Sequence, residues 1–324
     1  MGQVQTALGP IDASRLGVTL MHEHVFVLST EVQRNWPTGW DAEVAVARAV
    51  ERLNDLAAHG VETVVDLTVV GLGRDIGLVK QVAEQVDLNI VVATGLYTYD
   101  SLPHYFDYRS AAMRPDGIDA LEGFFLHDIE EGISGTEVRP AILKCATDTP
   151  GVTSGVERVL RAVAKAHRKT GLPISTHTHA ATHRGLEQQR IFESEGVDLS
   201  RVVIGHSGDS TDLEYLEELL AAGSVLGMDR FGLDTICPTE KRIQTVVKLC
   251  ELGWANQLVL SHDASCHIDW LDDDLLRKGA PDWHFGFLSE EVLPKMRERG
   301  VTDAQLRAML VDTPRRLLEG GPGY

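Results

Sequence analysis

Short apolar runs alternate with amphipathic segments about eight times along the 324 residues of this chain. Each apolar run has the length of a buried strand, and the segments between the runs have the spacing of helices that cover a sheet. Eight such units in about 300 residues favour a (β/α)8 barrel, an α/β fold, over an open, doubly wound sheet. We expect strands at residues 17–25, 61–69, 88–96, 139–146, 172–178, 201–207, 224–230 and 257–263.

The helical segments have recognisable faces and ends. Segments 41–58 and 239–252 carry apolar residues at helical spacing. No linker, low-complexity stretch or internal repeat divides the chain, so we expect residues 1–324 to form one domain. Three capping boxes and three closing glycines are expected at helix ends, namely Ser154 with Glu157, Thr211 with Glu214, Thr302 with Gln305, and Gly60, Gly171 and Gly223.

The composition limits the class of protein. A hydrophobic fraction of 43% and a charged fraction of 24% are ordinary for a globular chain, and no apolar run is long enough to predict a membrane span. The N-terminus does not resemble a secretory signal, and the four cysteines lack CxxC spacing, which predicts a cytoplasmic protein with free thiols. A formal net charge of −18 argues against a nucleic-acid partner and favours a neutral or cationic small ligand.

Two histidines in the first expected strand point to a common site. His22 and His24 are two residues apart, so their side chains should share one face of the strand. Imidazoles placed in this way can bind one cation. Taken alone, the pair is equally consistent with two buried histidines that hydrogen-bond to neighbouring groups.

Further polar residues interrupt the apolar runs near the carboxyl ends of later strands, where barrel active sites are built. Lys144 lies in an otherwise apolar run, where a lysine is costly unless it is paired or modified. Taken singly, His206 could instead cap the helix that follows, Asp263 could be a turn residue, and Lys144 could pair with a carboxylate. Together they favour a metal site whose nitrogen and oxygen ligands suit zinc, cobalt, manganese or ferrous iron. Besides Lys144, the polar residues near the carboxyl ends of these strands are His177, His206 and Asp263.

The remaining histidines are expected to have structural roles. His262 adjoins Asp263 but has the opposite phase on its strand, so its side chain should point out of the barrel. His59, His127 and His167 lie on helices or at their ends and should be solvated. His179 and His183 follow the fifth strand, where they could either support the metal ligands or be polar residues of a loop.

Short motifs occur in order along the chain: MHEH at 21–24, TGLY at 94–97, ILK at 142–144, THT at 176–178, GLEQQR at 185–190, IGHSGD at 204–209, GMDRFG at 227–232 and SHD at 261–263. Through these motifs the chain resembles the phosphotriesterase family of the amidohydrolase superfamily. Within that family it is similar to the phosphotriesterase-like lactonases. The resemblance runs from Gly17 to about Arg316 and supports the expected barrel.

The resemblance implies a site with two divalent metal ions, which could be zinc, cobalt, iron or manganese. Lys144 would be carbamylated by carbon dioxide, and its two new oxygens would bridge the ions beside a bridging hydroxide. This change would also turn a costly buried ammonium into an anion that the cations neutralise. The other ligands would be His22, His24 and Asp263 on the more buried ion and His177 and His206 on the more exposed ion.

The resemblance also implies a reaction. The bridging hydroxide would attack a lactone carbonyl, and Asp263 would accept its proton and pass it to the departing alkoxide. Tyr97 after the third strand and Arg230 after the seventh occupy the positions that orient substrate in the lactonase-like subgroup.

Residues 264–288 correspond to the specificity loop of these relatives. Apolar side chains in this loop could hold an acyl chain, or could instead pack the loop or a subunit interface. The loop begins differently from that of the relatives at 264–267, so the substrate preference stays open. The apolar side chains are Trp270, Leu271, Trp283, Phe285 and Phe287.

We therefore expect a lactonase for N-acyl-homoserine lactones and related γ- and δ-lactones, active in quorum quenching, with secondary hydrolysis of organophosphate triesters. A dedicated phosphotriesterase (aryldialkylphosphatase) is the first alternative. A catalytically silent metal-binding or small-molecule-binding protein is the second, and the presence of all six ligand-type residues argues against it. The family also implies a homodimer, for which Trp36 and Trp40 are candidate contact residues, and no membrane partner.

Overall fold

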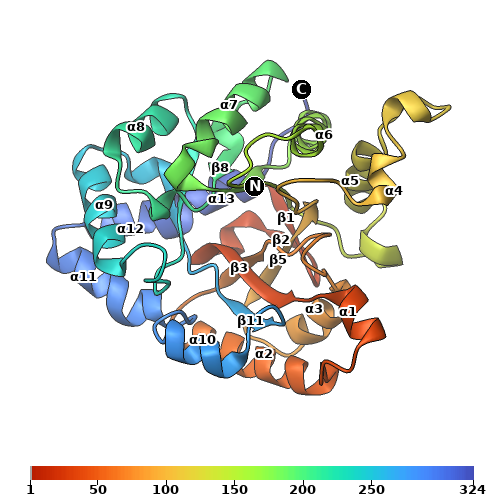
Figure 1. The fold of residues 1–324 in the computed structure, drawn as a ribbon. Helices are drawn as coiled ribbons and strands as arrows, with labels where there is room; N and C mark the ends of the chain where they lie inside the picture. Colours follow the sequence, from red (N-terminus) through yellow and green to blue (C-terminus); the bar gives the residue numbers. More distant parts are fainter. Residues whose placement is uncertain (1) are drawn as a thin grey trace.

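The computed structural model describes residues 2–324, except for the side chains of residues 273 and 277 (Figure 1). Within these residues a sheet of nine parallel strands has the order β10-β9-β8-β7-β6-β5-β4-β3-β11. Each of the eight predicted strands is present, and the fold is the predicted (β/α)8 barrel. The strands are β3 (Thr19–Val27), β4 (Thr63–Asp66), β5 (Asn89–Gly95), β6 (Ile142–Thr147), β7 (Ile174–Thr178), β8 (Val202–Ile204), β9 (Val225–Met228), β10 (Leu258–Leu260) and β11 (Ser265–Ile268).

The sheet closes on itself at a seam between its first barrel strand and the chain that leaves its last one. The amide of Asp263, three residues after β10, donates to the carbonyl of His22 over 3.0 Å. The amide of His24 then donates to the carbonyl of Ala264 over 2.9 Å. From there the chain continues as β11, which pairs in parallel with the end of β3. The backbone around three predicted site residues therefore forms the closure.

Three strands were not predicted. The segment 264–288 was expected to be a loop, but it begins with β11. A strand forms there because β3 runs to Val27, two residues beyond the prediction, and offers a free edge. A short antiparallel hairpin of β1 (Gln3–Thr6) and β2 (Gly9–Asp12) precedes the barrel.

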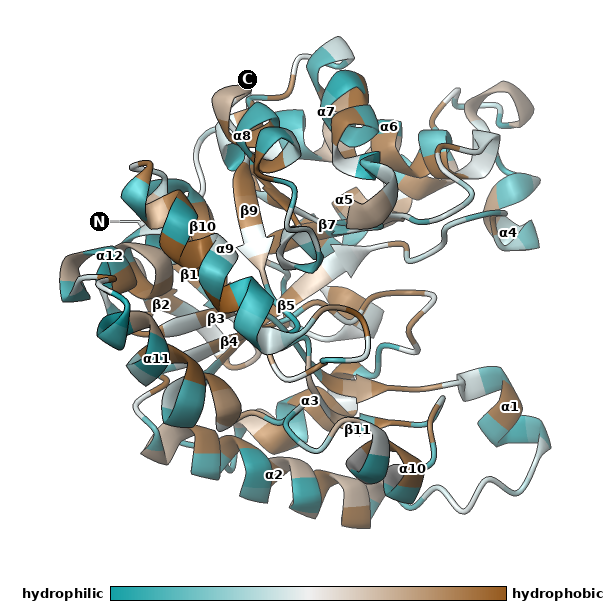
Figure 2. Cartoon of the chain, turned by 60° about the vertical axis from the view of Figure 1, so that its left-hand side comes forward, coloured by the Kyte–Doolittle hydropathy of each residue, from teal (hydrophilic) through white to brown (hydrophobic). Residues whose placement is uncertain are grey.

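Helices surround the barrel (Figure 1), and in Figure 2 several of them carry hydrophilic and hydrophobic bands, as expected of helices with one face on a sheet. The predicted helices at 41–58 and 239–252 are confirmed as α2 and α9. The helices are α1 (Thr30–Asn35), α2 (Ala42–Ala58), α3 (Ile76–Ala83), α4 (His104–Asp107), α5 (Ala120–Glu130), α6 (Ser154–Thr170), α7 (Arg184–Ser194), α8 (Leu213–Ala221), α9 (Thr239–Glu251), α10 (Asp273–Gly279), α11 (Leu293–Glu298), α12 (Asp303–Arg307) and α13 (Thr313–Leu318).

The helix starts agree with the sequence in one case of three. Thr302 and Gln305 form the predicted capping box at the start of α12. The other two predictions are wrong by one residue, because a neighbouring side chain accepts the hydrogen bonds of the first turn. The N-cap of α6 is Thr153 rather than Ser154, and that of α8 is Asp212 rather than Thr211.

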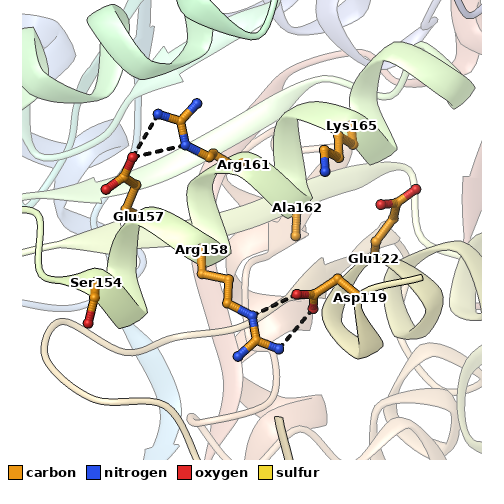
Figure 3. Close-up of a pocket in the computed structure, with 8 residues that line it drawn as sticks. All are labelled: Asp119, Glu122, Ser154, Glu157, Arg158, Arg161, Ala162 and Lys165. Carbon is orange, nitrogen blue, oxygen red and sulfur yellow. Dashed lines mark hydrogen bonds and ion pairs between the residues drawn. The ribbon is translucent and has the colours of Figure 1, made fainter. Parts of the chain in front are cut away.

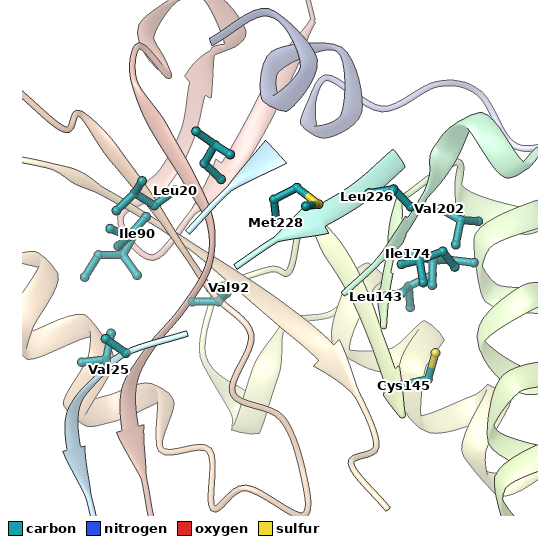
Figure 4. Packing of buried hydrophobic residues seen from close by; sticks show 14 of the residues in the cluster. Leu20, Val25, Ile90, Val92, Leu143, Cys145, Ile174, Val202, Leu226 and Met228 are labelled. Atoms are coloured by element: carbon teal, nitrogen blue, oxygen red, sulfur yellow. The ribbon is translucent and has the colours of Figure 1, made fainter. Parts of the chain in front are cut away.

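Buried apolar residues form two layers, as the alternation of side chains along a strand requires. On β6, Ile142 faces the interior of the barrel, whereas Leu143 and Cys145 face the helices. Figure 4 shows part of this outer layer, including Val92 on β5 and Leu226 on β9. Interior positions near the carboxyl ends of the strands carry the polar residues, so the apolar core ends where the candidate site begins.

Two predictions from composition can be compared with the structure. All four cysteines are free thiols, as predicted, and all are buried. Among the helices of residues 2–324, none is long and apolar enough to cross a membrane.

The glycines that follow helices provide a stability prediction. Gly171 and Gly60 both have a left-handed backbone, with φ of 73° and 87°. A Cβ at Gly171 would lie 1.9 Å from the carbonyl oxygen of Gly321, whereas a Cβ at Gly60 would meet no atom within 4 Å. Backbone strain should cost Gly60→Ala about 1–2 kcal/mol, and the added clash should cost Gly171→Ala more. Urea unfolding measures both, and equal losses would contradict the predicted clash.

Candidate metal centre

The six predicted ligand residues lie together at the carboxyl-terminal mouth of the barrel. Their side chains line one cavity of about 210 Å³. Different strands bring them there, because each residue lies on an interior-facing position within its strand or shortly after the strand ends. The six are His22 and His24 on β3, Lys144 on β6, His177 on β7, and His206 and Asp263 after β8 and β10.

The backbone is unusual at three of the strand ends. His206, Arg230 and Asp263 have φ of 58°, 64° and 55°, in the left-handed region that non-glycine residues rarely adopt. Such residues cluster where a function requires a particular side-chain direction. Here the conformation lets each side chain reach the cavity immediately after its strand ends.

The first group of candidate ligands is His22, His24 and Asp263. His22 Nδ1 lies 3.1 Å from Asp229 Oδ2, and His24 Nδ1 lies 2.8 Å from Thr68 Oγ1. If both Nδ1–H groups donate there, both Nε2 atoms keep a lone pair. These atoms face Asp263 Oδ1 at 3.4 Å and 3.2 Å. These three acceptor atoms converge on one point, as the ligands of a bound cation do.

The second group is His177 and His206. His177 Nε2 lies 2.7 Å from Asp148 Oδ2, and His206 Nδ1 lies 2.8 Å from Asp229 Oδ1. With protons on these nitrogens, His177 Nδ1 and His206 Nε2 face each other at 2.9 Å as two acceptors. A cation bound by both lone pairs would remove their repulsion.

Sequence reasoning assigned no role to Asp229, which contacts a histidine from each group. Its two carboxylate oxygens accept from Nδ1 of His22 and of His206, and Oδ2 also accepts from the His206 amide over 3.1 Å. These nitrogens are the ones opposite the cavity-facing Nε2 atoms, so Asp229 orients the ligands from behind rather than binding a metal with them. The sequence signal that could have identified Asp229 was its position directly after β9, at which the side chain turns towards the interior of the barrel.

Lys144 is the most unusual buried group of the site. Its side chain is almost completely buried, and Nζ donates to His22 Nε2 over 3.1 Å. Burial lowers the pKa of Lys144 to about 8, so more of its neutral amine is present near neutral pH than for an exposed lysine. Ser175 pairs with Lys144 in the register of β6 and β7, and its buried Oγ has no hydrogen-bond partner among the described residues. The Lys144 amine and the Ser175 hydroxyl, which lacks a hydrogen-bond partner among the described residues, thus lie at the same level of the barrel.

The protonation states suit metal binding. Burial lowers the pKa of His22 to about 4 and also lowers the pKa of His177 and His206. Neutral imidazoles are the form that binds metals. Burial by itself would raise the pKa of Asp263, but contacts that include His22 and Arg230 hold that pKa well below its usual range, so the side chain is a carboxylate.

Tyr97 and Arg230, the two predicted substrate-orienting residues, line the same cavity. The Tyr97 hydroxyl lies 3.5 Å from His177 Nδ1, and burial raises the pKa of Tyr97, which keeps the hydroxyl protonated. Arg230 donates from Nε to Asp263 Oδ2 and from a terminal nitrogen to Asp209 Oδ2, both over 2.9 Å. The structure therefore places Arg230 between two carboxylates, one of them a candidate metal ligand.

The predicted specificity loop contributes only part of its apolar residues to the cavity. Trp270, Leu271 and Trp283 line it, and Trp270 is 50% exposed. Phe285 and Phe287 were expected in the same wall, but they are buried in the layer between barrel and helices. At Phe285 and Phe287 the chain has left the cavity wall and re-entered the core, just before the next helical segment begins.

The other histidines agree with the sequence except for one. His262 points out of the barrel as predicted, with Nδ1 2.9 Å from Glu23 Oε1. His167 was expected to be solvated but is buried, because its two ring nitrogens contact the Leu172 carbonyl and the Tyr324 hydroxyl. At or near the surface lie His59, His127, His179 and His183.

A second hollow, of about 250 Å³, lies between α5 and α6 away from the barrel mouth (Figure 3). Four of its charged side chains form two pairs: Arg158 pairs with Asp119 over 2.7 Å, and Arg161 pairs with Glu157 over 2.7 Å. These groups already satisfy each other, so we assign the hollow no catalytic role.

The model of the phosphotriesterase family matches residues 2–318. The phosphotriesterase homology protein of Mycobacterium tuberculosis is 57% identical over 325 residues, with both chains fully covered. The aryldialkylphosphatase of Saccharolobus solfataricus is 38% identical, over 94% of this chain and 96% of that protein. The solved structure of the phosphotriesterase from M. tuberculosis superposes with a TM-score of 0.97 over 99% of this chain and 100% of that one.

The fold and the site thus define an α/β-barrel protein with a histidine–carboxylate cluster at its mouth. The chain belongs to the phosphotriesterase family. Membership in this family indicates a metal-dependent hydrolase that acts on small molecules.

The role of Asp229 can be tested by Asp229→Asn. An asparagine cannot accept from both imidazoles and the His206 amide as the carboxylate does, so the histidines should lose their orientation. We expect metal affinity to fall about 10–100-fold, measured by competition with a chelator. Asp128→Asn is the control, because Asp128 is similarly buried but pairs with Arg74 and Thr94. Equal affinities for the two variants would show that Asp229 does not orient the ligands.

Proposed function

We propose that the protein is a binuclear metal-dependent lactonase. It would hydrolyse N-acyl-homoserine lactones and related γ- and δ-lactones, with weaker hydrolysis of organophosphate triesters. The observation that supports this proposal is the set of residues that line the cavity. Two converging sets of metal-donor atoms form its floor, while Tyr97, Arg230 and an apolar loop form its wall.

The donor set fits two divalent ions of the zinc, cobalt, iron and manganese class, which accept nitrogen and oxygen ligands. Bound there, the ions would supply an activated water nucleophile and polarise the electrophilic carbonyl. Lys144 would bridge them as a carbamate, formed from its amine and carbon dioxide. We assign His22, His24 and Asp263 to one ion and His177 and His206 to the other.

Asp263 is suited to move a proton between attack and departure. Water would add its oxygen to the lactone carbonyl carbon and release a proton, the ring carbon–oxygen bond would break, and the product would be a hydroxy acid. Asp263 would take that proton and return it to the departing alkoxide.

The wall residues support a lactone over a triester. The protonated Tyr97 hydroxyl can donate to an oxygen of the ester group, and Arg230 is held beside Asp263 at the same rim. Trp270, Leu271 and Trp283 provide an apolar surface that suits an acyl chain. A dedicated phosphotriesterase is the alternative, and the name of the S. solfataricus relative favours it.

We retain two further inferences from the family. Residues 1–324 would form one hydrolase domain, and the protein would act as a homodimer. Of the two predicted contact residues, Trp36 is 69% exposed and remains a candidate. Trp40 packs against Phe26 and His267 within the same chain, which leaves less of its ring for a partner.

The bridging role of Lys144 is tested by Lys144→Ala. The variant should lose metal and activity, and short carboxylic acids should partly restore both by supplying a bridge. Carbon-13 NMR after incubation with labelled carbon dioxide should show a carbamate signal in the wild type that the variant lacks. Lys165→Ala, which removes an exposed lysine on α6, is the control. A fully metallated wild type with no carbamate signal would exclude the bridge.

Substrate class is tested by kcat/KM for a series of acyl-homoserine lactones beside paraoxon. Each added methylene contributes about 0.8 kcal/mol when buried, so kcat/KM should rise a few-fold per carbon until the wall is covered. Paraoxon should be far poorer than the best lactone. Trp270→Ala should flatten the chain-length dependence more than it lowers activity on the shortest lactone.

Two controls make this comparison decisive. Tyr108→Ala removes another exposed aromatic side chain that does not line the cavity, and it should leave the profile unchanged. A higher kcat/KM for paraoxon than for every lactone would refute the lactonase assignment and favour the phosphotriesterase. Activity that survives complete removal of metal would refute both.

A further inference from the structure

The glutamate between the two histidines of β3 has no part in the cavity, yet it is among the most buried charged residues of the protein. Glu23 is 1% exposed. Because side chains alternate along a strand, it points away from His22 and His24, into the layer outside the barrel. A buried carboxylate in such a layer is costly unless hydrogen bonds satisfy it, so its partners indicate what it does.

The partners of Glu23 are the residues on either side of Asp263. Oε1 accepts from the backbone amide of His262 over 2.8 Å, and Oε2 accepts from the amide of Ala264 over 2.9 Å. The carboxylate therefore holds both amides that flank Asp263. Asp263 has a φ of 55°, which is unfavourable for a residue with a Cβ and persists only where neighbouring contacts impose it.

The ring of His262 supplies a third hydrogen bond. Its Nε2 accepts from the amide of Leu288 over 3.0 Å, so Nδ1 carries the proton and donates to Glu23 Oε1 over 2.9 Å. All three hydrogen bonds are thus donated to Glu23, so both of its carboxylate oxygens must act as acceptors. A glutamine at this position would direct its own N–H group at one of the donors.

The same contacts reach the wall of the cavity. The indole Nε1 of Trp283 donates to the carbonyl of His262 over 2.8 Å, and Leu288 follows the loop that contains Trp283. Glu23 therefore fixes, through His262, the point at which the specificity loop returns to the barrel.

We propose that Glu23 is a positioning residue that holds the Asp263 carboxylate against Nε2 of His22 and His24. The triplet His22-Glu23-His24 then has two functions: its histidines face the cavity as ligands, and its glutamate faces outward to fix the third ligand of the same group. This inference rests on the proposed function only in treating Asp263 as a metal ligand.

The test compares Glu23→Gln with the wild type by metal binding. Cobalt(II) affinity, from chelator competition, should fall about 10–100-fold, and the visible absorption of the cobalt-loaded protein should change because the position of Asp263 changes. Asp128→Asn controls for the loss of a buried carboxylate elsewhere. It should lower stability towards urea but leave cobalt affinity and the spectrum unchanged.

The outcomes separate positioning from general stability. If Glu23→Gln loses stability but keeps wild-type affinity and spectrum, Glu23 is only structural and the inference is wrong. Should that variant fail to fold, Glu23→Asp keeps the charge on a side chain one methylene shorter and gives the same comparison. A wild type that binds cobalt but hydrolyses no lactone would refute the proposed function and leave this inference intact.

Discussion

The seam that closes the barrel determines where the candidate ligands lie. Two backbone hydrogen bonds join His22 and His24 to Asp263 and Ala264. The same pairing that completes the sheet therefore brings the Asp263 carboxylate to within 3.4 Å of both imidazoles. A shift of one residue in this register would turn the histidines towards the helices. The hydrogen bonds that close the barrel therefore also bring the first group of candidate ligands together.

This arrangement concentrates unfavourable features at the mouth. Two imidazole nitrogens lie 2.9 Å apart, an amine is buried, and three residues including Arg230 and Asp263 adopt left-handed backbone conformations. A structure selected only for stability would avoid these features, and proteins retain them mainly at functional sites. Bound cations would offset the repulsion between acceptors, so metal binding and stability of the mouth should be coupled.

The sequence predicts the parts of this structure that follow from periodicity and position. Alternation along strands placed Lys144 and His177 correctly, because interior positions at strand ends must meet in a closed barrel. Residues that act through other residues were not recognised. Asp229 and Glu23 look like ordinary polar residues in a line of sequence, since their partners are distant along the chain. His167 was misplaced for the same reason, because Tyr324 covers it from the far end of the chain.

The candidate metal ligands form the floor of the cavity, and a loop forms part of its wall. This difference explains why the reaction class is easier to infer than the substrate. Candidate ligands come from strands and their immediate ends, where the barrel backbone restricts each side chain. The wall comes from a loop whose Trp270 is half exposed, and whose position depends on a few anchors such as the indole bond from Trp283 to His262. Loops tolerate change better than strands do. A lactone and a phosphotriester could thus share one metal floor, and the loop would decide between them.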